Sequence, residues 1–227
     1  MTESSQLNKA ATAQAAQQSS RMEAYYRFHA KIYNATRWSF LFGRKPLLKH
    51  LAQHYQPKRI LEIGCGTGQN LLRLRQQFPQ AHIVGLDASE TMLAVARKQL
   101  LKHDTEAFKQ LELLATVYDA PLSQQNIAPF DLIVVSYTLS MINPGWEEVV
   151  NSTTKDLSEN GVIAVVDFHD SSLKGFKRWM AVNHVQMHGH LYNKLSQTFH
   201  TEHEQINKAY FGVWKYMSFI GSMAKQS

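Results

Sequence analysis

The sequence predicts a doubly wound α/β domain with a mostly parallel sheet, and two observations lead to this prediction. From residue 57 onward, short and nearly all-apolar runs alternate with segments of helical spacing. Such runs are typical of parallel strands that helices bury on both faces. The second observation is the stretch from Ile60 to Asn70, where an apolar run ends in Gly64, Gly66 and Gly68 before a helical pattern begins. Alternate glycines permit a tight turn and let a ligand approach the backbone closely.

The expected elements can be placed along the chain. After a helix at residues 47–55, the alternating part gives strands at 59–63, 82–86, 111–117, 131–136 and 162–168, and helices at 70–78, 90–101 and 146–157. In the last third, residues 174–185 and 191–199 have helical spacing. Residues 205–212 and 214–219 are predicted to be extended, and they are close enough to form an antiparallel hairpin at one sheet edge.

Three regions differ in composition. Residues 1–20 are rich in Gln, Ala and Ser, which predicts a flexible tail rather than a docking arm. Residues 21–56 contain many aromatic side chains, and a helical segment that closes over a site as a lid is expected there. Residues 57–227 hold the α/β domain. In the second region, Tyr26 and Tyr33 have helical spacing, so they belong either to this lid or to the packed face of a helix.

The charge and the single cysteine limit the partners and the chemistry. The formal net charge of +6 favours an anionic partner, such as nucleic acid, anionic lipid or a phosphorylated substrate. Cys65 is the only cysteine, so neither a disulfide framework nor a cysteine-based zinc site forms within one chain. His184 and His188 are four residues apart, but Gly189 interrupts the helix and no carboxylate completes the set. No metal is expected.

The sequence was also checked for a secretory signal and for membrane-spanning runs. Residues 1–20 lack the basic and apolar parts of a secretory signal, and the longest apolar runs are too short and too interrupted to span a bilayer. A cytoplasmic protein is therefore predicted, either soluble or peripherally bound to the inner face of a membrane.

Polar residues follow the expected strands at the edge where ligands of doubly wound sheets bind. Asp87 ends the second strand, 19 residues after Gly68, and a carboxylate there can accept hydrogen bonds from two ribose hydroxyls. Capping of the next helix is the alternative role for Asp87, although Ser89 is better placed for it. Asp119 follows the third strand, where it either receives an adenine amino group or is an ordinary loop residue. Ser136 ends the fourth strand.

In this order the motifs resemble those of class I S-adenosylmethionine-dependent methyltransferases. The matching residues are Glu62-Ile63-Gly64-Cys65-Gly66-Thr67-Gly68, Gly85-Leu86-Asp87, Asp119-Ala120, Phe130-Asp131 and Gly161. A nicotinamide-binding fold would more often carry G-x-G-x-x-G. The resemblance implies a Rossmann-like, seven-stranded sheet with an antiparallel last strand, S-adenosylmethionine as cofactor and S-adenosylhomocysteine as product. The implied cofactor-binding residues are Tyr33, Arg37, Glu62, Gly64, Cys65, Gly66, Gly68, Asp87, Ala88, Met92, Asp119, Ala120 and Ser136.

A narrower resemblance lies largely outside the cofactor core. Residues 26–44, 179–185 and 214–216 are similar to segments of bacterial betaine-lipid methyltransferases, which convert the amino group of diacylglyceryl-homoserine to a trimethylammonium. Where that family often has an aspartate after the tyrosine at position 33, this chain has Asn34. The resemblance implies a lipid headgroup as the methyl acceptor and a membrane surface as a partner, with no nucleic acid. The alternatives are another amphiphile (phosphatidylethanolamine or a quinone precursor), RNA, or a partner protein that binds the cofactor without turnover.

Methyl transfer from a sulfonium to an amine is an in-line displacement, so it needs positioning rather than a protein nucleophile or a metal. The amine must be uncharged, because an ammonium has no lone pair, and a nearby group has to guide or receive its proton. Tyr137, His169 and His184 are the candidates for this catalytic role. His169 is preferred because it lies just past a strand end, and capping of the following helix is the alternative role.

Overall fold

A computed structural model describes residues 40–103 and 110–223 of the chain. The chain divides into a first unit, residues 1–40, and a second unit, residues 41–227. The predicted tail (1–20), Tyr33, Arg37 and the greater part of the predicted lid (21–56) lie outside the described residues. The α/β domain falls within the second unit.

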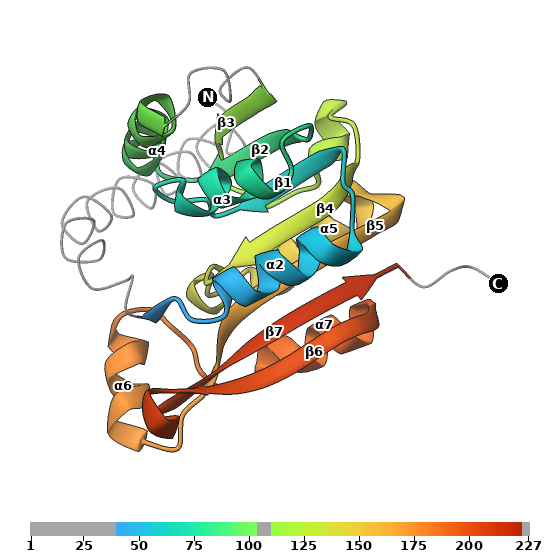
Figure 1. The fold of residues 1–227 in the computed structure, drawn as a ribbon. Coiled ribbons are helices and arrows are strands. Elements are labelled where there is room, and N and C mark those ends of the chain that lie inside the picture. The colour runs from blue at the N-terminus through green and yellow to red at the C-terminus, as the bar shows by residue number, and fades with distance from the viewer. Residues whose placement is uncertain (1–39, 104–109, 224–227) are drawn as a thin grey trace, which may run out of the picture. The chain divides into compact units, whose positions relative to one another are not determined.

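The described strands form one seven-stranded sheet with the order β3-β2-β1-β4-β5-β7-β6 (Figure 1). The strands are β1 (Arg59–Ile63), β2 (His82–Asp87), β3 (Leu111–Ala115), β4 (Phe130–Ser136), β5 (Leu157–Asp170), β6 (His200–Ala209) and β7 (Trp214–Ser222). The pairs among β1 to β5 are parallel, whereas β7 is antiparallel to both β5 and β6. The predicted Rossmann-like sheet with an antiparallel last strand is confirmed.

Strand order reverses at β1. This strand pairs with β2 on one side and with β4 on the other, so that Glu62 lies opposite Gly85 and Val134. The connections that leave the carboxyl ends of β1 and β4 therefore run to opposite sides of the sheet. In doubly wound sheets this switch point is where ligands bind.

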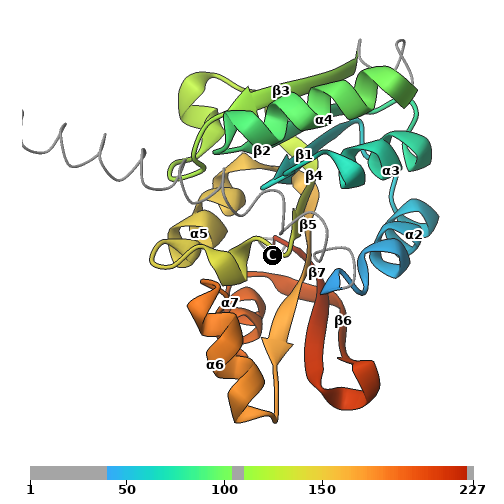
Figure 2. The ribbon, with the colours of Figure 1, turned by 90° about the vertical axis from the view of Figure 1, so that its left-hand side faces the viewer.

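Helices cover both faces of the sheet. They are α2 (Arg44–His54), α3 (Gln69–Gln77), α4 (Glu90–His103), α5 (Trp146–Asp156), α6 (Lys174–Val182) and α7 (His190–Thr198). Figure 2 shows α2 and α3 on one side of the sheet, and α5 and α7 on the other. Because both faces are covered, the central strands need apolar side chains in every direction, which explains their nearly continuous apolar sequence.

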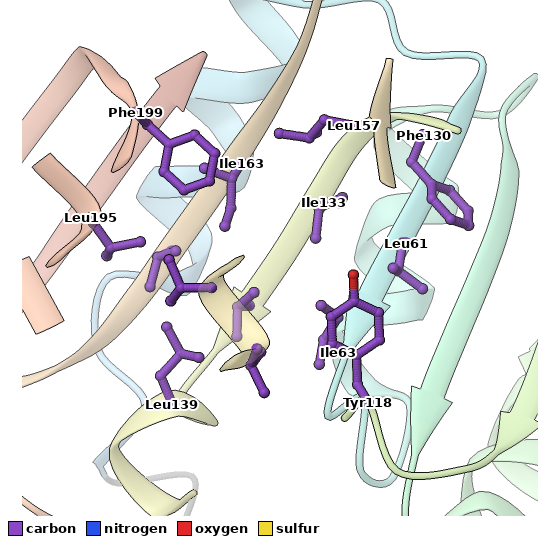
Figure 3. Packing of buried hydrophobic residues seen from close by; sticks show 14 of the residues in the cluster. Leu61, Ile63, Tyr118, Phe130, Ile133, Leu139, Leu157, Ile163, Leu195 and Phe199 are labelled. Carbon is purple, nitrogen blue, oxygen red and sulfur yellow. The ribbon is translucent and has the colours of Figure 1, made fainter. Parts of the chain in front are cut away.

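The main hydrophobic cluster fills the layer between the sheet and its helices (Figure 3). Strand residues such as Ile133 and Ile163 are fully buried there, and Leu195 of α7 packs over them together with Phe199. Full burial of a side chain of this size stabilises the fold by roughly 1.5 to 3 kcal/mol relative to leaving it exposed. The cluster fixes the sheet, and thereby the positions of the strand ends.

Three predicted boundaries need correction. The helix predicted at 174–185 ends at Val182, because His184 adopts a left-handed backbone conformation (φ 61°) that a helix cannot continue. The extended run predicted to reach residue 212 stops at Ala209, and a 3₁₀ turn, Tyr210–Gly212, joins the two hairpin strands. The fifth strand starts at Leu157 rather than at Val162, with a register shift in its pairing to β4 between Phe130 and Leu132.

Candidate active site

The glycine turn after β1 is tied to β2 and pressed against the end of β4. The amides of Gly64 and Cys65 both donate to the Leu86 carbonyl oxygen, at 2.8 and 3.0 Å. Gly64 has φ 71°, and a Cβ added there would lie 2.4 Å from Oγ1 of Thr138. A left-handed conformation with no room for a side chain requires glycine. Glycine is thus required at position 64 both by the backbone conformation and by the close approach of Thr138 at the switch point.

Asp87 holds this turn and the start of α4 together. Its Oδ2 accepts a hydrogen bond from the Gly66 amide at 2.8 Å, and its Oδ1 accepts one from the Ser89 amide at 2.9 Å. The Ser89 hydroxyl accepts from the Met92 amide at 3.3 Å, so Ser89 caps α4 as its position in the sequence predicts. Asp87 is half-buried, and its contact with two ribose hydroxyls stays a prediction.

Two predicted cofactor residues on the turn are buried. Glu62 lies on β1 with 1% of its surface exposed. Burial, and then the nearby charges of Glu62 and Asp87, raise the pKa of the Cys65 thiol far above its usual range. A thiol in such surroundings stays protonated and unreactive. Cys65 therefore contributes its backbone and its volume to the turn rather than a nucleophile.

A buried carboxylate that the sequence interpretation missed holds the loop after β3. Asp156, in the last turn of α5, accepts hydrogen bonds from the Tyr118 hydroxyl at 2.6 Å and from the Leu122 and Ser123 amides at 2.8 Å. Between these anchors the loop carries Asp119, which is exposed, and Ala120, which is half-buried. Asp156 could have been noticed in the sequence because it is an acidic residue at a helix C-terminus, where the helix dipole disfavours negative charge.

The end of β4 is occupied by internal hydrogen bonds. Arg44 donates through Nε to the Ser136 hydroxyl at 2.6 Å and through Nη2 to the Ser136 carbonyl oxygen at 3.3 Å. The Tyr137 hydroxyl donates to the Phe42 carbonyl oxygen at 2.7 Å. Burial, and then the charge of Asp167, raise the pKa of Tyr137 well above its usual range, and Arg44 opposes this in part. In this arrangement the Tyr137 phenol remains neutral and points into the protein.

An aromatic cluster joins the ends of β4 and β5 to β7. Its members are Phe42, Tyr137, Phe168, Trp214 and Tyr216, and neighbouring rings have centroids between 4.8 and 6.5 Å apart. Close packing extends to the backbone, because a Cβ added to Gly43 would lie 2.5 Å from Cε2 of Tyr216. Three members are buried, whereas Phe42 and Tyr216 remain partly exposed. The cluster therefore presents aromatic surface beside the strand ends.

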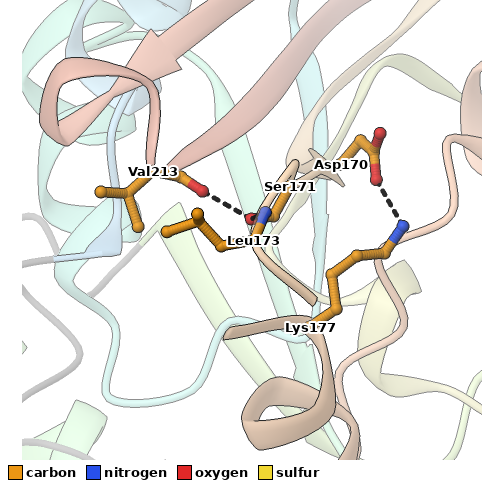
Figure 4. Close-up of polar contacts among 5 residues, drawn as sticks. All are labelled: Asp170, Ser171, Leu173, Lys177 and Val213. Atoms are coloured by element: carbon orange, nitrogen blue, oxygen red, sulfur yellow. Dashed lines mark hydrogen bonds and ion pairs between the residues drawn. The ribbon is translucent and has the colours of Figure 1, made fainter. Parts of the chain in front are cut away.

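His169 follows the buried part of β5 and is half-buried. Burial lowers the pKa of His169, the nearby Lys215 lowers it further, and Asp170 opposes them. Asp170 is itself paired with Lys177, whose Nζ lies 2.7 Å from Oδ1 (Figure 4). At neutral pH the imidazole is thus uncharged and able to accept a proton. His184, the third candidate, lies on the exposed turn after α6.

A second histidine, His190, lies near His169. Its main chain follows Gly189, whose amide donates to the His169 carbonyl oxygen at 2.8 Å, and its ring packs against Trp146 with centroids 4.8 Å apart. Nδ1 of His169 and both ring nitrogens of His190 are buried without a hydrogen-bond partner in residues 40–103 and 110–223. Within the same ranges, no group of three or more His, Cys, Asp or Glu residues is arranged to hold a metal ion.

Comparison with known proteins agrees with this geometry. Residues 61–163 match the family described as a methyltransferase domain. Among curated relatives, trans-aconitate 2-methyltransferase of Acidovorax sp. (strain JS42) is 45% identical over 58 residues, which are 25% of this chain and 22% of that protein. Malonyl-[acyl-carrier protein] O-methyltransferase of Bacillus cereus is 30% identical over 126 residues, or 54% of this chain and 43% of that protein. The chain thus spans less than half the length of these relatives.

Solved structures share the fold. N-methyltransferase NodS from Bradyrhizobium japonicum WM9, in complex with S-adenosylhomocysteine, superposes with a TM-score of 0.64 at 16% identity, over 80% of this chain and 86% of that one. The [4+2]-cyclase SpnF gives a TM-score of 0.71 at 13% identity, over 90% and 96% of the two chains. Since these names include an N-methyltransferase and a cyclase, the shared fold leaves the reaction partner open.

Residues 61–163 thus match a methyltransferase domain, and the order of the described strands agrees with that match. The match indicates S-adenosylmethionine as the cofactor. We propose that Gly64, Asp87 and the loop held by Asp156 contact its methionine, ribose and adenine parts respectively. This particular chain is similar to NodS in fold and to trans-aconitate 2-methyltransferase in sequence over 58 residues. Among the described residues, no helix is long and apolar enough to cross a membrane.

Proposed function

We propose that this protein methylates the amino group of a membrane lipid headgroup, converting diacylglyceryl-homoserine to its trimethyl betaine by successive transfers from S-adenosylmethionine. The observation that carries this proposal is the aromatic cluster at the ends of β4 and β5. Phe42, Trp214 and Tyr216 belong to the segments that resemble the betaine-lipid methyltransferases, and they pack within 5.8 to 6.2 Å of one another, centroid to centroid.

Aromatic surface suits this chemistry because the reaction begins with one cation and ends with another. The cofactor supplies a methyl group from a sulfonium, and a fully methylated amine is a quaternary ammonium that can never lose its charge. The face of an aromatic ring attracts such cations by about 0.5 to 2 kcal/mol. Phe42 and Tyr216, the partly exposed members of the cluster, are the residues we assign to this contact.

We propose that His169 accepts the proton that the amine loses before each methyl transfer, either directly or through water. Its pKa is lowered by burial, so the uncharged imidazole predominates at neutral pH. The buried ring nitrogens of His169 and His190 need hydrogen-bond partners, since buried polar atoms are rarely left without one. A headgroup that carries an amine and a carboxylate offers such partners. The hydroxyl of Tyr137 is directed to Phe42, and His184 is exposed, so both are assigned supporting roles at most.

The proposal is tested with purified protein, labelled S-adenosylmethionine and a panel of acceptors. The panel contains diacylglyceryl-homoserine, phosphatidylethanolamine, a quinone precursor and total RNA. We expect label in the homoserine lipid, with mono-, di- and trimethylated forms appearing in succession. Label confined to phosphatidylethanolamine or to the quinone precursor would make that amphiphile the acceptor in place of the homoserine lipid. Label in RNA would refute the proposal.

A further inference from the structure

The helix α6 and the turn of the β6–β7 hairpin lie at the same end of the sheet (Figures 1 and 2), and both carry exposed apolar side chains. On α6 and just before it, Leu173, Trp179 and Val182 are exposed, Val182 to 74%. At the hairpin tip Tyr210 is exposed to 44%, and Phe211 is fully exposed. Exposed apolar residues that gather in one region mark interaction sites, whereas single ones need no explanation. We name these five residues the apolar tip.

The two parts of the apolar tip are connected by hydrogen bonds. The Ser171 hydroxyl donates to the Val213 carbonyl oxygen at 2.5 Å and accepts from the Leu173 amide at 3.1 Å (Figure 4). Ser171 therefore fixes the start of α6 to the end of the hairpin turn. Phe42 of the aromatic cluster packs against Tyr210 with ring centroids 5.2 Å apart. The apolar tip is thus continuous with the candidate active site.

The turn at the hairpin tip holds two residues in a strained backbone conformation. Tyr210 and Phe211 have φ angles of 46° and 58°, in the left-handed region that Gly and Asn adopt most easily. Each such residue costs about 1 to 2 kcal/mol. A turn of Gly and Asn would join the strands with less strain and no exposed aromatic side chain. A strained turn that exposes a phenylalanine indicates a role other than stability.

The charge around the apolar tip is mainly positive, with Asp170 as its acidic neighbour. Residues 171–190 contain three Lys and Arg residues, Lys174, Lys177 and Arg178, and no acidic residue. Residues 205–222 contain Lys208 and Lys215, again without an acidic residue. Lys174, Arg178 and Lys208 are exposed, while Lys177 is engaged by Asp170. Apolar side chains surrounded by cations suit the interface of an anionic bilayer, where the former enter the acyl boundary and the latter meet the phosphates.

We propose that the apolar tip inserts into the interface of an anionic lipid bilayer and brings the candidate active site to the headgroups. This inference rests on the proposed lipid substrate. The partner is the lipid surface itself, bound through apolar insertion and phosphate contacts.

The test is sedimentation of the full chain with vesicles of phosphatidylcholine alone or mixed with phosphatidylglycerol. We expect binding to the mixed vesicles that weakens as salt is added. The double variant Val182→Ser with Phe211→Ser is expected to bind at least about tenfold more weakly, since each loses the transfer of an apolar side chain. The control is Leu101→Ser, which removes a comparably exposed apolar side chain from α4. Unchanged thermal melting shows that the variants fold.

A second variant and a second readout separate charge from insertion. Lys174→Glu with Arg178→Glu is expected to abolish the preference for phosphatidylglycerol. Brominated lipids are expected to quench the fluorescence of Trp179, and Trp179→Phe should remove that quenching. Binding of the double serine variant equal to that of the wild type would overturn the inference, as would a wild type that ignores anionic vesicles. If the protein methylates detergent-dispersed homoserine lipid without binding vesicles, only this inference fails; if it binds vesicles but methylates no lipid, only the proposed function fails.

Discussion

At the scale of single residues, the candidate site depends on a few positions that leave little choice of side chain. Gly64 must turn in a left-handed conformation where Thr138 leaves no room for a Cβ. Asp87 and Asp156 each use one carboxylate to hold segments that are far apart in the sequence. These residues position backbone and loops around the cofactor, and their loss should weaken cofactor binding before it affects the rest of the fold.

Gly64→Ala tests the glycine turn after β1. The substitution adds a Cβ 2.4 Å from the Thr138 hydroxyl and forces alanine into a left-handed conformation, which costs about 1 to 2 kcal/mol before any clash. We expect calorimetry to show loss of S-adenosylhomocysteine binding, with a lower free energy of unfolding. Gly175→Ala is the matched control, because nothing lies within 4 Å of its added Cβ. Equal cofactor binding by both variants would remove the turn from the site.

Asp156→Asn tests the anchored loop. The amide keeps one acceptor oxygen but loses the charge that three donors share, and we expect the free energy of unfolding to fall by about 2 kcal/mol. Affinity for S-adenosylhomocysteine should fall as well, because residues 118–123 are no longer held. Tyr118→Phe removes only one of the three hydrogen bonds and serves as the graded control. A loss of stability with unchanged cofactor affinity would restrict Asp156 to a structural role.

His169→Gln tests the proton acceptor. General base catalysis typically contributes 10²- to 10⁴-fold, so we expect kcat to fall within about that range. The wild-type rate should rise with pH through the lowered pKa of His169, below its ordinary value of 6.5, since only the neutral imidazole accepts a proton. The variant should lose that rise. His184→Gln is the control, and if it removed the rise instead, the role would pass to His184.

At the scale of elements, α2 is attached to the sheet edge by a stack of imidazoles. His50 lies between His54, on the same helix, and His203 of β6, with ring centroids 4.2 and 4.4 Å away. Burial, followed by the charges of His203 and His54, lowers the pKa of His50. The unfolded chain therefore binds this proton more readily than the folded one, and the contribution of the stack to stability declines as pH falls below about 6.5.

The measurement is urea unfolding of the wild type and of His50→Gln across this pH range. Buried Asp167 acts in the opposite direction, because burial raises its pKa to about 6 and so favours the folded state as pH falls. The effect of His50 must therefore be read as the difference between the two proteins. We expect this difference to shrink on acidification, whereas His200→Gln, at the exposed start of β6, should leave the pH dependence unchanged. A constant difference would show that the stack carries no titration.

Elements were predictable from the sequence where the pattern is local. The strand at 59–63 coincides with β1, since an apolar run bounded by Pro57 and Gly64 has a single interpretation. The hairpin tip was mistaken for strand because Tyr210 and Phe211 lack turn chemistry. Asp156 was missed because its loop contacts lie 33 to 38 residues away in the sequence. The role of Arg44 was equally hidden, since it reaches Ser136 across 92 residues.

At the scale of the whole molecule, we propose that the two halves of the sheet have separate tasks. The part from β1 to β3 carries the glycine turn, Asp87 and the loop held by Asp156, whereas β5, β7 and α6 carry His169 and most of the aromatic cluster and the apolar tip. The first part matches methyltransferase domains in general. We propose that the second part decides the acceptor, because it carries most of the aromatic cluster together with His169.

The central claim is that this second part presents a lipid amine to the methyl group. The most direct measurement is mass spectrometry of diacylglyceryl-homoserine after incubation with the protein and S-adenosylmethionine that carries a deuterated methyl group. The account predicts one, two and then three deuterated methyl groups on the headgroup nitrogen, with formation of S-adenosylhomocysteine in equal amount. A homoserine lipid that stays unlabelled, while the protein binds the cofactor and the lipid is dispersed, would contradict it.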